Sequence, residues 1–460
     1  MTEVTESSKA QASEFEREPV PNSELKGASK FWGMYAGEHC AGTEFVIGPL
    51  FLLNGVSLGN IFLGLLLGNL LAVLSWRFLC APIATKARLT LYYHLEKIAG
   101  DKLVILYNLA NGILFCFLAG AMITVSATAV GIPFDMPMPT ASSLLPNSLS
   151  FVLIVFAVGA VIAIVAAKGY ETVANFANIA APWMILVFAA CGIIAFAQLE
   201  VSNWTALKEL WANSITFAQE GQTETRMGFW SVVFFGWFCN AAMHVGMSDL
   251  SVFRFAKKES YGWATAAGMY VGHYMAWIAA AFMLAAQIKL QQSADPVPGP
   301  IAYNIAGLAG IICVIIAGWT TANPTIYRAG LAFQAIMPKI SRFKVTLVTG
   351  FIATFAGMFP AIAMKLLDFV GLYGTILAPI GAIIVFDWYF HRKGDPSNLH
   401  GAQPASSFSI PVLLAWLIPV GIAIILMRTT DISAWYFPLP TWIGCGLLYL
   451  AFTRNSFANS

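Results

Sequence analysis

Charged residues are scarce in this chain. Only 10% of its 460 residues are Asp, Glu, Lys or Arg, whereas 58% are hydrophobic, and the mean hydropathy is +0.72. Soluble domains carry about 25% charged residues, so this composition excludes an ordinary soluble enzyme. The formal net charge of +2 gives no reason to expect a nucleic-acid partner.

Several motifs of catalysis and energy conversion are also missing. The sequence has no glycine-rich nucleotide-binding loop, no zinc-ligand spacing and no serine-centred elbow. These absences argue against ATP-driven transport by this chain and against an enzyme. All seven cysteines fall in apolar segments without paired spacing, so we expect reduced, packed thiols rather than disulfides or a metal site.

Apolar segments of membrane-spanning length make up most of the chain. About 20 helical residues cross the hydrocarbon core of a bilayer, and the sequence contains twelve such segments. They cover residues 31–55, 57–78, 103–130, 149–167, 174–198, 229–250, 262–288, 301–336, 345–362, 368–391, 409–427 and 433–452. Residues 1–28 have the polar composition of a disordered cytoplasmic tail. We predict an all-α polytopic membrane protein with ten helices in a core of residues 29–395 and two more in residues 396–460.

The basic residues indicate an orientation in the membrane. With the amino terminus inside, 20 of the 25 Lys and Arg residues fall on the cytoplasmic side, including Arg328, and 5 fall outside. This is the bias that the positive-inside rule describes. We therefore expect a multi-pass protein of the inner or plasma membrane with both termini in the cytoplasm.

The first apolar segment contains two carboxylates. Glu38 and Glu44 lie within the stretch FWGMYAGEHCAGTEF, residues 31–45, where a charge at mid-bilayer costs about 2.5–3.5 kcal/mol. Three glycines, which are poor helix formers, surround them: Gly33, Gly37 and Gly42. A helix that begins only near Thr43 would leave too short a span, so a broken helix is favoured.

A second segment has the same character in the other half of the chain. Residues 231–250 carry Gly236, Asn240, His244 and Gly246 within an apolar run. Interrupted helices at matching positions are typical of inverted-repeat transporters that bind their solute between the repeats. Helices 1–5 and 6–10 would form the two repeats, and helices 11 and 12 would be additional.

Four stretches resemble the nucleobase–cation–symport-1 family, which includes the cytosine and hydantoin permeases. AGWTTANPTIYRAGLAF (317–333) and LAPIGAIIVFDWYFHRK (377–393) resemble its helices 8 and 10, and residues 31–48 resemble its helix 1 more loosely. The end of helix 6 is also similar, with two extra residues between Asp249 and Arg254.

The resemblance implies a leucine-transporter-type 5+5 inverted repeat that works by alternating access. It also implies a cation site built from two carbonyls of helix 1 and a carbonyl and two hydroxyls of helix 8. These map to Gly37, Cys40, Ala317, Thr320 and Thr321. Uncharged hard oxygens suit sodium, although threonine hydroxyls often bond within their own helix and a proton could replace sodium.

The family's solute site, which holds a flat heterocycle between aromatic rings, is only partly matched. The resemblance assigns it here to Ala41, Phe115, Ala119, Trp237 and Ile326. The amide side chains that read the ring edge are missing at their usual places. Asn240 and Asn323 could substitute for them or could bond neighbouring helices.

Glu38 and Glu44 leave the solute class open. A carboxylate near aromatic rings suits an organic cation and equally suits a proton carrier, and Glu44 could instead form a buried pair with His244. His39 is expected to be a polar wall residue.

We expect a cation-coupled symporter, a monomer or weak oligomer, that imports a purine, pyrimidine or related heterocycle. The alternatives are a symporter for an amine, guanidine or vitamin-like cation, and a non-transporting channel or intramembrane enzyme.

Overall fold

The computed structural model describes residues 14–139, 143–220, 226–364, 366–401 and 407–457. Most of the chain in these ranges is helical, and its β pairing there consists of one isolated bridge between Lys26 and Ala256. Seven of the helical stretches are long and apolar enough to cross a membrane.

The twelve predicted spans, which we number helices 1 to 12 in chain order, are present as single or divided helices, which confirms the predicted fold class. The continuous ones are α4 (Leu58–Ser75) with α5 (Ala81–Ala87), α7 (Asp101–Val130), α8 (Leu149–Ala167), α9 (Tyr170–Gln198), α14 (Met275–Gln291), α16 (Arg342–Ala356), α21 (Ile410–Thr429) and α22 (Pro438–Phe457). Helix 8 is α15 (Pro298–Ile336), which is kinked at Gly307, where φ is 57° and ψ is −136°. The divided ones are α2 (Ala28–His39) with α3 (Glu44–Leu53), α11 (Phe229–Phe238) with α12 (Ala241–His244) and α13 (Leu250–Phe253), and α18 (Leu366–Ile376) with α19 (Ile380–Phe386).

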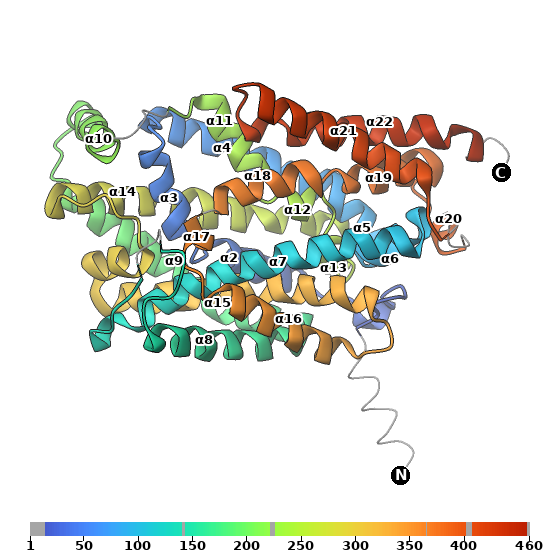
Figure 1. Cartoon of the computed structure of the whole chain (residues 1–460), viewed down its shortest axis with the longest axis horizontal. Helices are drawn as coiled ribbons and strands as arrows, with labels where there is room; N and C mark the ends of the chain where they lie inside the picture. The colour runs from blue at the N-terminus through green and yellow to red at the C-terminus, as the bar shows by residue number, and fades with distance from the viewer. Residues whose placement is uncertain (1–13, 140–142, 221–225, 365, 402–406, 458–460) are drawn as a thin grey trace, which may run out of the picture.

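The spanning helices run along the long axis of the molecule (Figure 1). The short helix α10 (Trp204–Ala218) lies at one end, and α6 (Leu91–Ala99) and α20 (Pro396–His400) lie at the other. Helices α7 and α15 pack closely: the Ser126 hydroxyl donates to the Ile315 carbonyl at 3.0 Å. A Cβ at Gly318 would lie 2.7 Å from the Met122 carbonyl oxygen, so this approach requires glycine.

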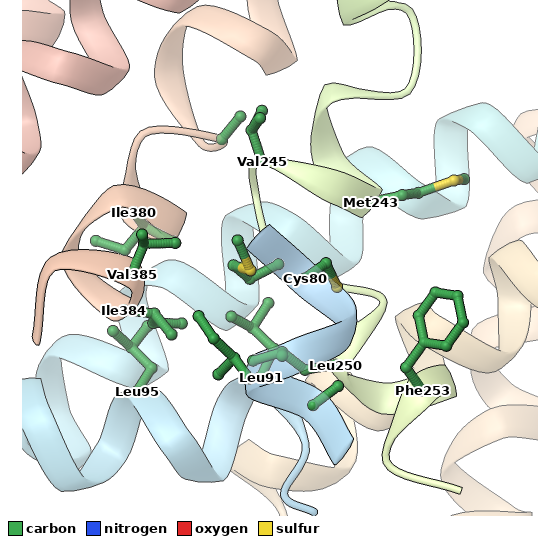
Figure 2. Packing of buried hydrophobic residues seen from close by; sticks show 14 of the residues in the cluster. Cys80, Leu91, Leu95, Met243, Val245, Leu250, Phe253, Ile380, Ile384 and Val385 are labelled. Atoms are coloured by element: carbon green, nitrogen blue, oxygen red, sulfur yellow. The ribbon is translucent and has the colours of Figure 1, made fainter. Parts of the chain in front are cut away.

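A buried apolar cluster holds the divided helix 6 in place. Figure 2 shows Leu91 of α6, Met243 of α12, Leu250 of α13 and Ile380 of α19 among the packed side chains of this region. These side chains belong to one cluster of buried residues. Because van der Waals packing holds helices together in a membrane, these contacts help to fix the divided helix 6 in place.

The amino-terminal segment differs from the expected disordered tail. Residues 1–13 lie outside the described residues, but residues 14–27, which we call the amino-terminal strap, pack against the helices. Arg254 donates to the Phe15 carbonyl at 2.6 Å, and the Thr90 hydroxyl donates to the Glu16 carbonyl at 3.0 Å. The backbone carbonyls of the strap thus accept hydrogen bonds from side chains of the helical part of the chain.

Candidate transport site

Helices 1 and 6 are both interrupted in the middle of the fold, as predicted. Helix α2 ends at His39 and α3 begins at Glu44, with Cys40 between them at φ −93° and ψ 62°, outside the helical region. Helix α11 ends at Phe238, and only two helices of four residues each, α12 and α13, follow it. The residues in both breaks are buried or half-buried.

The glycines of helix 1 have a different role from the one expected. Gly33 and Gly37 lie within α2 and face α9, where a Cβ at Gly37 would lie 3.1 Å from the Ala177 Cβ. They serve close helix packing rather than unwinding. Gly42 alone lies in the break, and a Cβ there would lie 3.0 Å from the Gly318 nitrogen of α15. The break therefore rests directly on helix 8.

A cavity of about 70 Å³ lies beside the two breaks. Its aromatic lining consists of Phe115, Phe235, Phe238, Trp277 and Tyr373. Its polar lining consists of Glu38, His39, Thr43, Glu44, Asn240, His273, Thr321 and Thr325. An engineered cavity that binds benzene measures about 150 Å³, so a single-ring solute requires these walls to separate slightly.

Two pairs of neighbouring rings form parts of this lining. Phe115 of α7 and Tyr373 of α18 lie with ring centroids 5.8 Å apart. His273, in the segment Ala267–Tyr274, stacks on Trp277 of α14 at 4.1 Å with planes 18° apart. Such rings bury a planar ligand well through stacking and edge contacts.

Glu44 is a buried carboxylate with weak contacts. It begins α3 and is 1% exposed, and its Oε1 lies 3.6 Å from His273 Nε2. The Thr43 hydroxyl reaches the same oxygen at 3.4 Å. Glu44 Oε2 has no hydrogen-bond partner among the described residues. This oxygen is thus an unused acceptor at the cavity wall.

The pairing of Glu44 with His244, which we considered from the sequence, does not occur. His244 Nε2 lies 2.9 Å from the Trp237 carbonyl oxygen, and its ring packs on Trp76 with centroids 4.7 Å apart. His273 takes the position beside Glu44 instead. No sequence pattern pointed to it, because His273 lies on helix 7, outside the resembling stretches.

The predicted solute-binding residues divide into two groups. Glu38, Glu44, Phe115 and Asn240 line the cavity. Among the described residues, five others do not line it: Ala41, Ala119, Trp237, Asn323 and Ile326.

Each member of the second group has other surroundings. Trp237 donates from Nε1 to the Ser75 hydroxyl at 2.9 Å, which turns its ring towards α4. Ala119 and Ile326 belong to the apolar cluster around Phe115. Ala41 and Asn323 are 1% exposed, and Asn323 Oδ1 lacks a hydrogen-bond partner within the described part of the chain.

The hydroxyls predicted to bind a cation converge with backbone oxygens. Thr320 and Thr321 both donate to the Ala317 carbonyl, at 3.0 and 3.2 Å. Thr321 also lies 2.7 Å from the Glu38 carbonyl oxygen, at the end of α2. On helix 1 the predicted ion ligands were the carbonyls of Gly37 and Cys40. The structure instead places the Glu38 carbonyl beside the Thr321 hydroxyl. The arrangement brings hard oxygen atoms from α2 and α15 together beside the break.

Arg328 is the central charged residue that the sequence analysis missed. It is fully buried, and its guanidinium donates to Glu38 at 2.5 and 3.2 Å and to Asp249 at 2.7 and 3.1 Å. The Tyr35 hydroxyl and the Trp76 indole donate to Asp249 at 2.6 and 2.7 Å. We call these five residues the Arg328 cluster. It joins helix 8 to both interrupted helices.

The positive-inside count treats Arg328 as a residue outside the membrane. A signal was nevertheless available, because Arg328 lies within the apolar stretch 317–333, as Glu38 lies within its own. Buried carboxylates need a partner of opposite charge. Searching for that partner would have pointed to Arg328.

Comparison with solved structures reveals the same fold in known transporters. Mhp1, described as a nucleobase–cation–symport-1 family transporter in a closed conformation with bromovinylhydantoin bound, matches with a TM-score of 0.72, 14% identity and 97% coverage of each chain. A Na⁺-coupled sialic acid symporter in a substrate-bound outward-open state matches with a TM-score of 0.64, 13% identity and coverage of 98% of this chain and 94% of that one.

A manganese transporter from Eremococcus coleocola, solved as a mutant, matches with a TM-score of 0.55 at 14% identity and 97% coverage of each chain. No family model and no curated protein matches the sequence. At these identities the likeness establishes the fold: an all-helical, multi-pass architecture of the leucine-transporter type.

Proposed function

We propose that this chain is a cation-coupled symporter that imports a small nitrogenous heterocycle, such as a purine or pyrimidine, by alternating access. The observation that supports it best is the cavity between the two interrupted helices. The cavity combines stacking surfaces with polar atoms that lack partners among the described residues, namely Glu44 Oε2, His39 Nε2 and Asn240 Nδ2. Unpaired buried polar atoms cost about 1–3 kcal/mol each, so a ligand that pairs with them gains affinity.

The solute is organic in this proposal rather than a metal ion. In the described part of the chain, no group of three or more His, Cys, Asp or Glu side chains is placed to hold a metal. The ring surfaces of Phe115, Tyr373 and Trp277 suit a flat molecule instead.

The coupling cation is proposed to bind between α2 and α15. The Thr321 hydroxyl already lies within hydrogen-bond distance of both the Ala317 and the Glu38 carbonyl oxygens, and Thr320 adds a second hydroxyl. A sodium ion there would replace hydrogen bonds between these groups with contacts to the ion. It would thereby link the break in helix 1 to helix 8.

The Arg328 cluster is proposed to close one route to the cavity. Tyr92 of α6 donates to the Arg328 carbonyl at 3.1 Å, so the cluster lies on the side of the cavity that faces α6. With both termini in the cytoplasm, as the basic residues indicate, this is the cytoplasmic side. Opening that route requires α15 to separate from α2 and α13, and therefore requires Arg328 to release its two carboxylates.

Uptake into proteoliposomes tests the proposal. Radiolabelled purines and pyrimidines should accumulate only with an inward cation gradient, and a sodium gradient and a pH gradient imposed separately would identify the cation. Efflux down the gradient without coupling would indicate a channel. Failure of all such solutes to bind or enter would overturn the proposed solute class.

An organic cation is the second candidate solute. The observation in its favour is Glu44, whose carboxylate has no Lys or Arg partner in the described part of the chain. Uptake of amines and guanidines under the same gradients distinguishes the two candidates.

A further inference from the structure

The two carboxylates of helix 1 are in opposite situations. Both oxygens of Glu38 accept from Arg328. Glu44 has one oxygen with contacts of only 3.4 and 3.6 Å and one with no hydrogen bond to any described residue. Arg328 already donates its hydrogen bonds to Glu38 and Asp249. The hydrogen-bond donors for Glu44 therefore have to come from a bound ligand.

Two features of the site favour the ionised form of Glu44 once a ligand supplies N–H donors to it. Glu44 is the first residue of α3, and negative charge at a helix amino terminus is stabilised by about 0.3–1 kcal/mol. The His273 ring lies beside Oε1. The carboxylate lies in the cavity wall with 1% exposure, so the N–H groups of a bound solute would take the place of water as its donors.

An ionised carboxylate accepts hydrogen bonds and cannot donate them. It pairs best with two parallel N–H groups, and such charge-assisted, two-point contacts are stronger than single ones. A ring N–H beside an exocyclic amino group supplies this geometry. A ring N–H beside a carbonyl supplies one donor and places a second acceptor against the carboxylate.

We infer that Glu44 is the specificity-determining residue of this site and selects heterocycles that present a ring N–H beside an exocyclic amino group over those in which a carbonyl oxygen replaces that amino group. Asn240 reads the rest of the ring, because its unpartnered Nδ2 lines the same cavity and can donate to a ring carbonyl or nitrogen. The inference rests on the proposed function and names the substrate class within it.

Three pyrimidines that differ at one position test the inference. 2-Amino-4-pyrimidinone, 4-pyrimidinone and uracil share a ring and carry an amino group, a hydrogen and a carbonyl oxygen at carbon 2. Guanine, hypoxanthine and xanthine form the matching purine series. Binding to the purified full chain should be tightest for the amino compound of each series, and at least about tenfold weaker for the carbonyl compound.

Variants of Glu44 identify the cause of this order. Glu44→Gln keeps the shape but replaces one acceptor with a donor, so the amino compound should lose at least about tenfold in affinity while the carbonyl compound loses little. Glu44→Asp keeps the charge, so the order should persist at weaker affinity. Thermal unfolding of each variant without ligand reports folding separately.

The outcomes separate this inference from the proposed function. If no compound of either series binds the wild-type chain, both fail. If the compounds bind with equal affinity, or the carbonyl compounds bind best, the proposed function stands and the selectivity of Glu44 is overturned. An unchanged order in folded Glu44→Gln would also overturn it.

Discussion

Glu38 connects Thr321 to Arg328 through two different groups. Its main-chain carbonyl accepts the Thr321 hydroxyl at 2.7 Å, and its carboxylate accepts from Arg328 at 2.5 Å. The backbone of this residue belongs to the proposed cation site, and its side chain belongs to the proposed cytoplasmic closure. A cation that shifts the end of α2 would therefore also shift the Glu38 carboxylate against Arg328.

Removing the charge of Arg328 should strongly destabilise the protein. Arg328→Gln leaves two buried carboxylates without a cation, and breaking a buried pair costs about 3–5 kcal/mol. Thermal unfolding in detergent measures the loss. Adding Glu38→Gln and Asp249→Asn to this variant should recover much of it. A single variant as stable as wild type would contradict the central role of this cluster.

The two carboxylates of the Arg328 cluster should respond differently to neutralisation. Asp249→Asn weakens the hydrogen bonds that Asp249 accepts from Arg328, Tyr35 and Trp76. Glu38→Gln leaves the Arg328–Asp249 pair intact. We expect Asp249→Asn to lower the unfolding temperature more than Glu38→Gln. The reverse order, measured in the same detergent, would show that Glu38 is the principal partner of Arg328.

The double variant Thr320→Ala and Thr321→Ala should abolish stimulation of solute binding by sodium. It removes two of the proposed oxygen ligands and should leave folding largely intact. Binding measured with and without sodium gives the result. Thr349→Ala is the matched control, because the Thr349 hydroxyl is also buried but donates only to the Val345 carbonyl of its own helix. Equal stimulation in the double variant would remove the sodium site, and uptake would then be tested with a pH gradient alone.

A methyl group at Gly42 should disturb the break in helix 1. An alanine Cβ there would meet Val125 at 2.9 Å and the Gly318 nitrogen at 3.0 Å, and overpacking typically costs about 1–3 kcal/mol. Gly42→Ala should lower both stability and transport. Gly421→Ala is the control, since nothing lies within 4 Å of its Cβ position. Wild-type transport by Gly42→Ala would show that the break can move away from α15 freely.

The amino-terminal strap should contribute measurable stability. Glu14 accepts from the Tyr170 backbone at 2.8 Å and lies 3.5 Å from Arg342. We expect Glu14→Gln to expose the strap to limited proteolysis sooner than Glu18→Gln, a change at an exposed neighbour. Cleavage at equal rates in the two variants would mean that the Glu14 contacts do not hold the strap.

Polar residues inside apolar runs were the most informative part of the sequence. Glu38, Glu44 and the paired segment with Asn240 predicted both interruptions, because buried polar groups need an enclosed cavity. The positions of these residues in the sequence did not predict which way each side chain points. Trp237 and Phe115 are both aromatic residues that the resemblance assigned to the solute site, yet Phe115 lines the cavity and Trp237 turns to Ser75.

Partners that lie far apart in the sequence were also missed. Arg328 and His273 become neighbours of Glu38 and Glu44 only through packing of helices 7 and 8 against helix 1. Composition alone likewise made the strap look unstructured, since it cannot reveal that Arg254 and Thr90 bond its backbone. The local sequence pattern identified the buried polar positions. Which partners they bind depends on contacts between segments that lie far apart in the sequence.

The small volume of the cavity has a practical consequence for inhibitors. At about 70 Å³, the cavity has no room for a heterocycle that carries a long substituent. In the proposed transport cycle, such a compound would occupy the site only in a state in which the cavity walls have separated, and it would hold the protein in that state. Substituted analogues of the solute should therefore act as conformation-selective ligands, suited to capturing a single open form for structure determination.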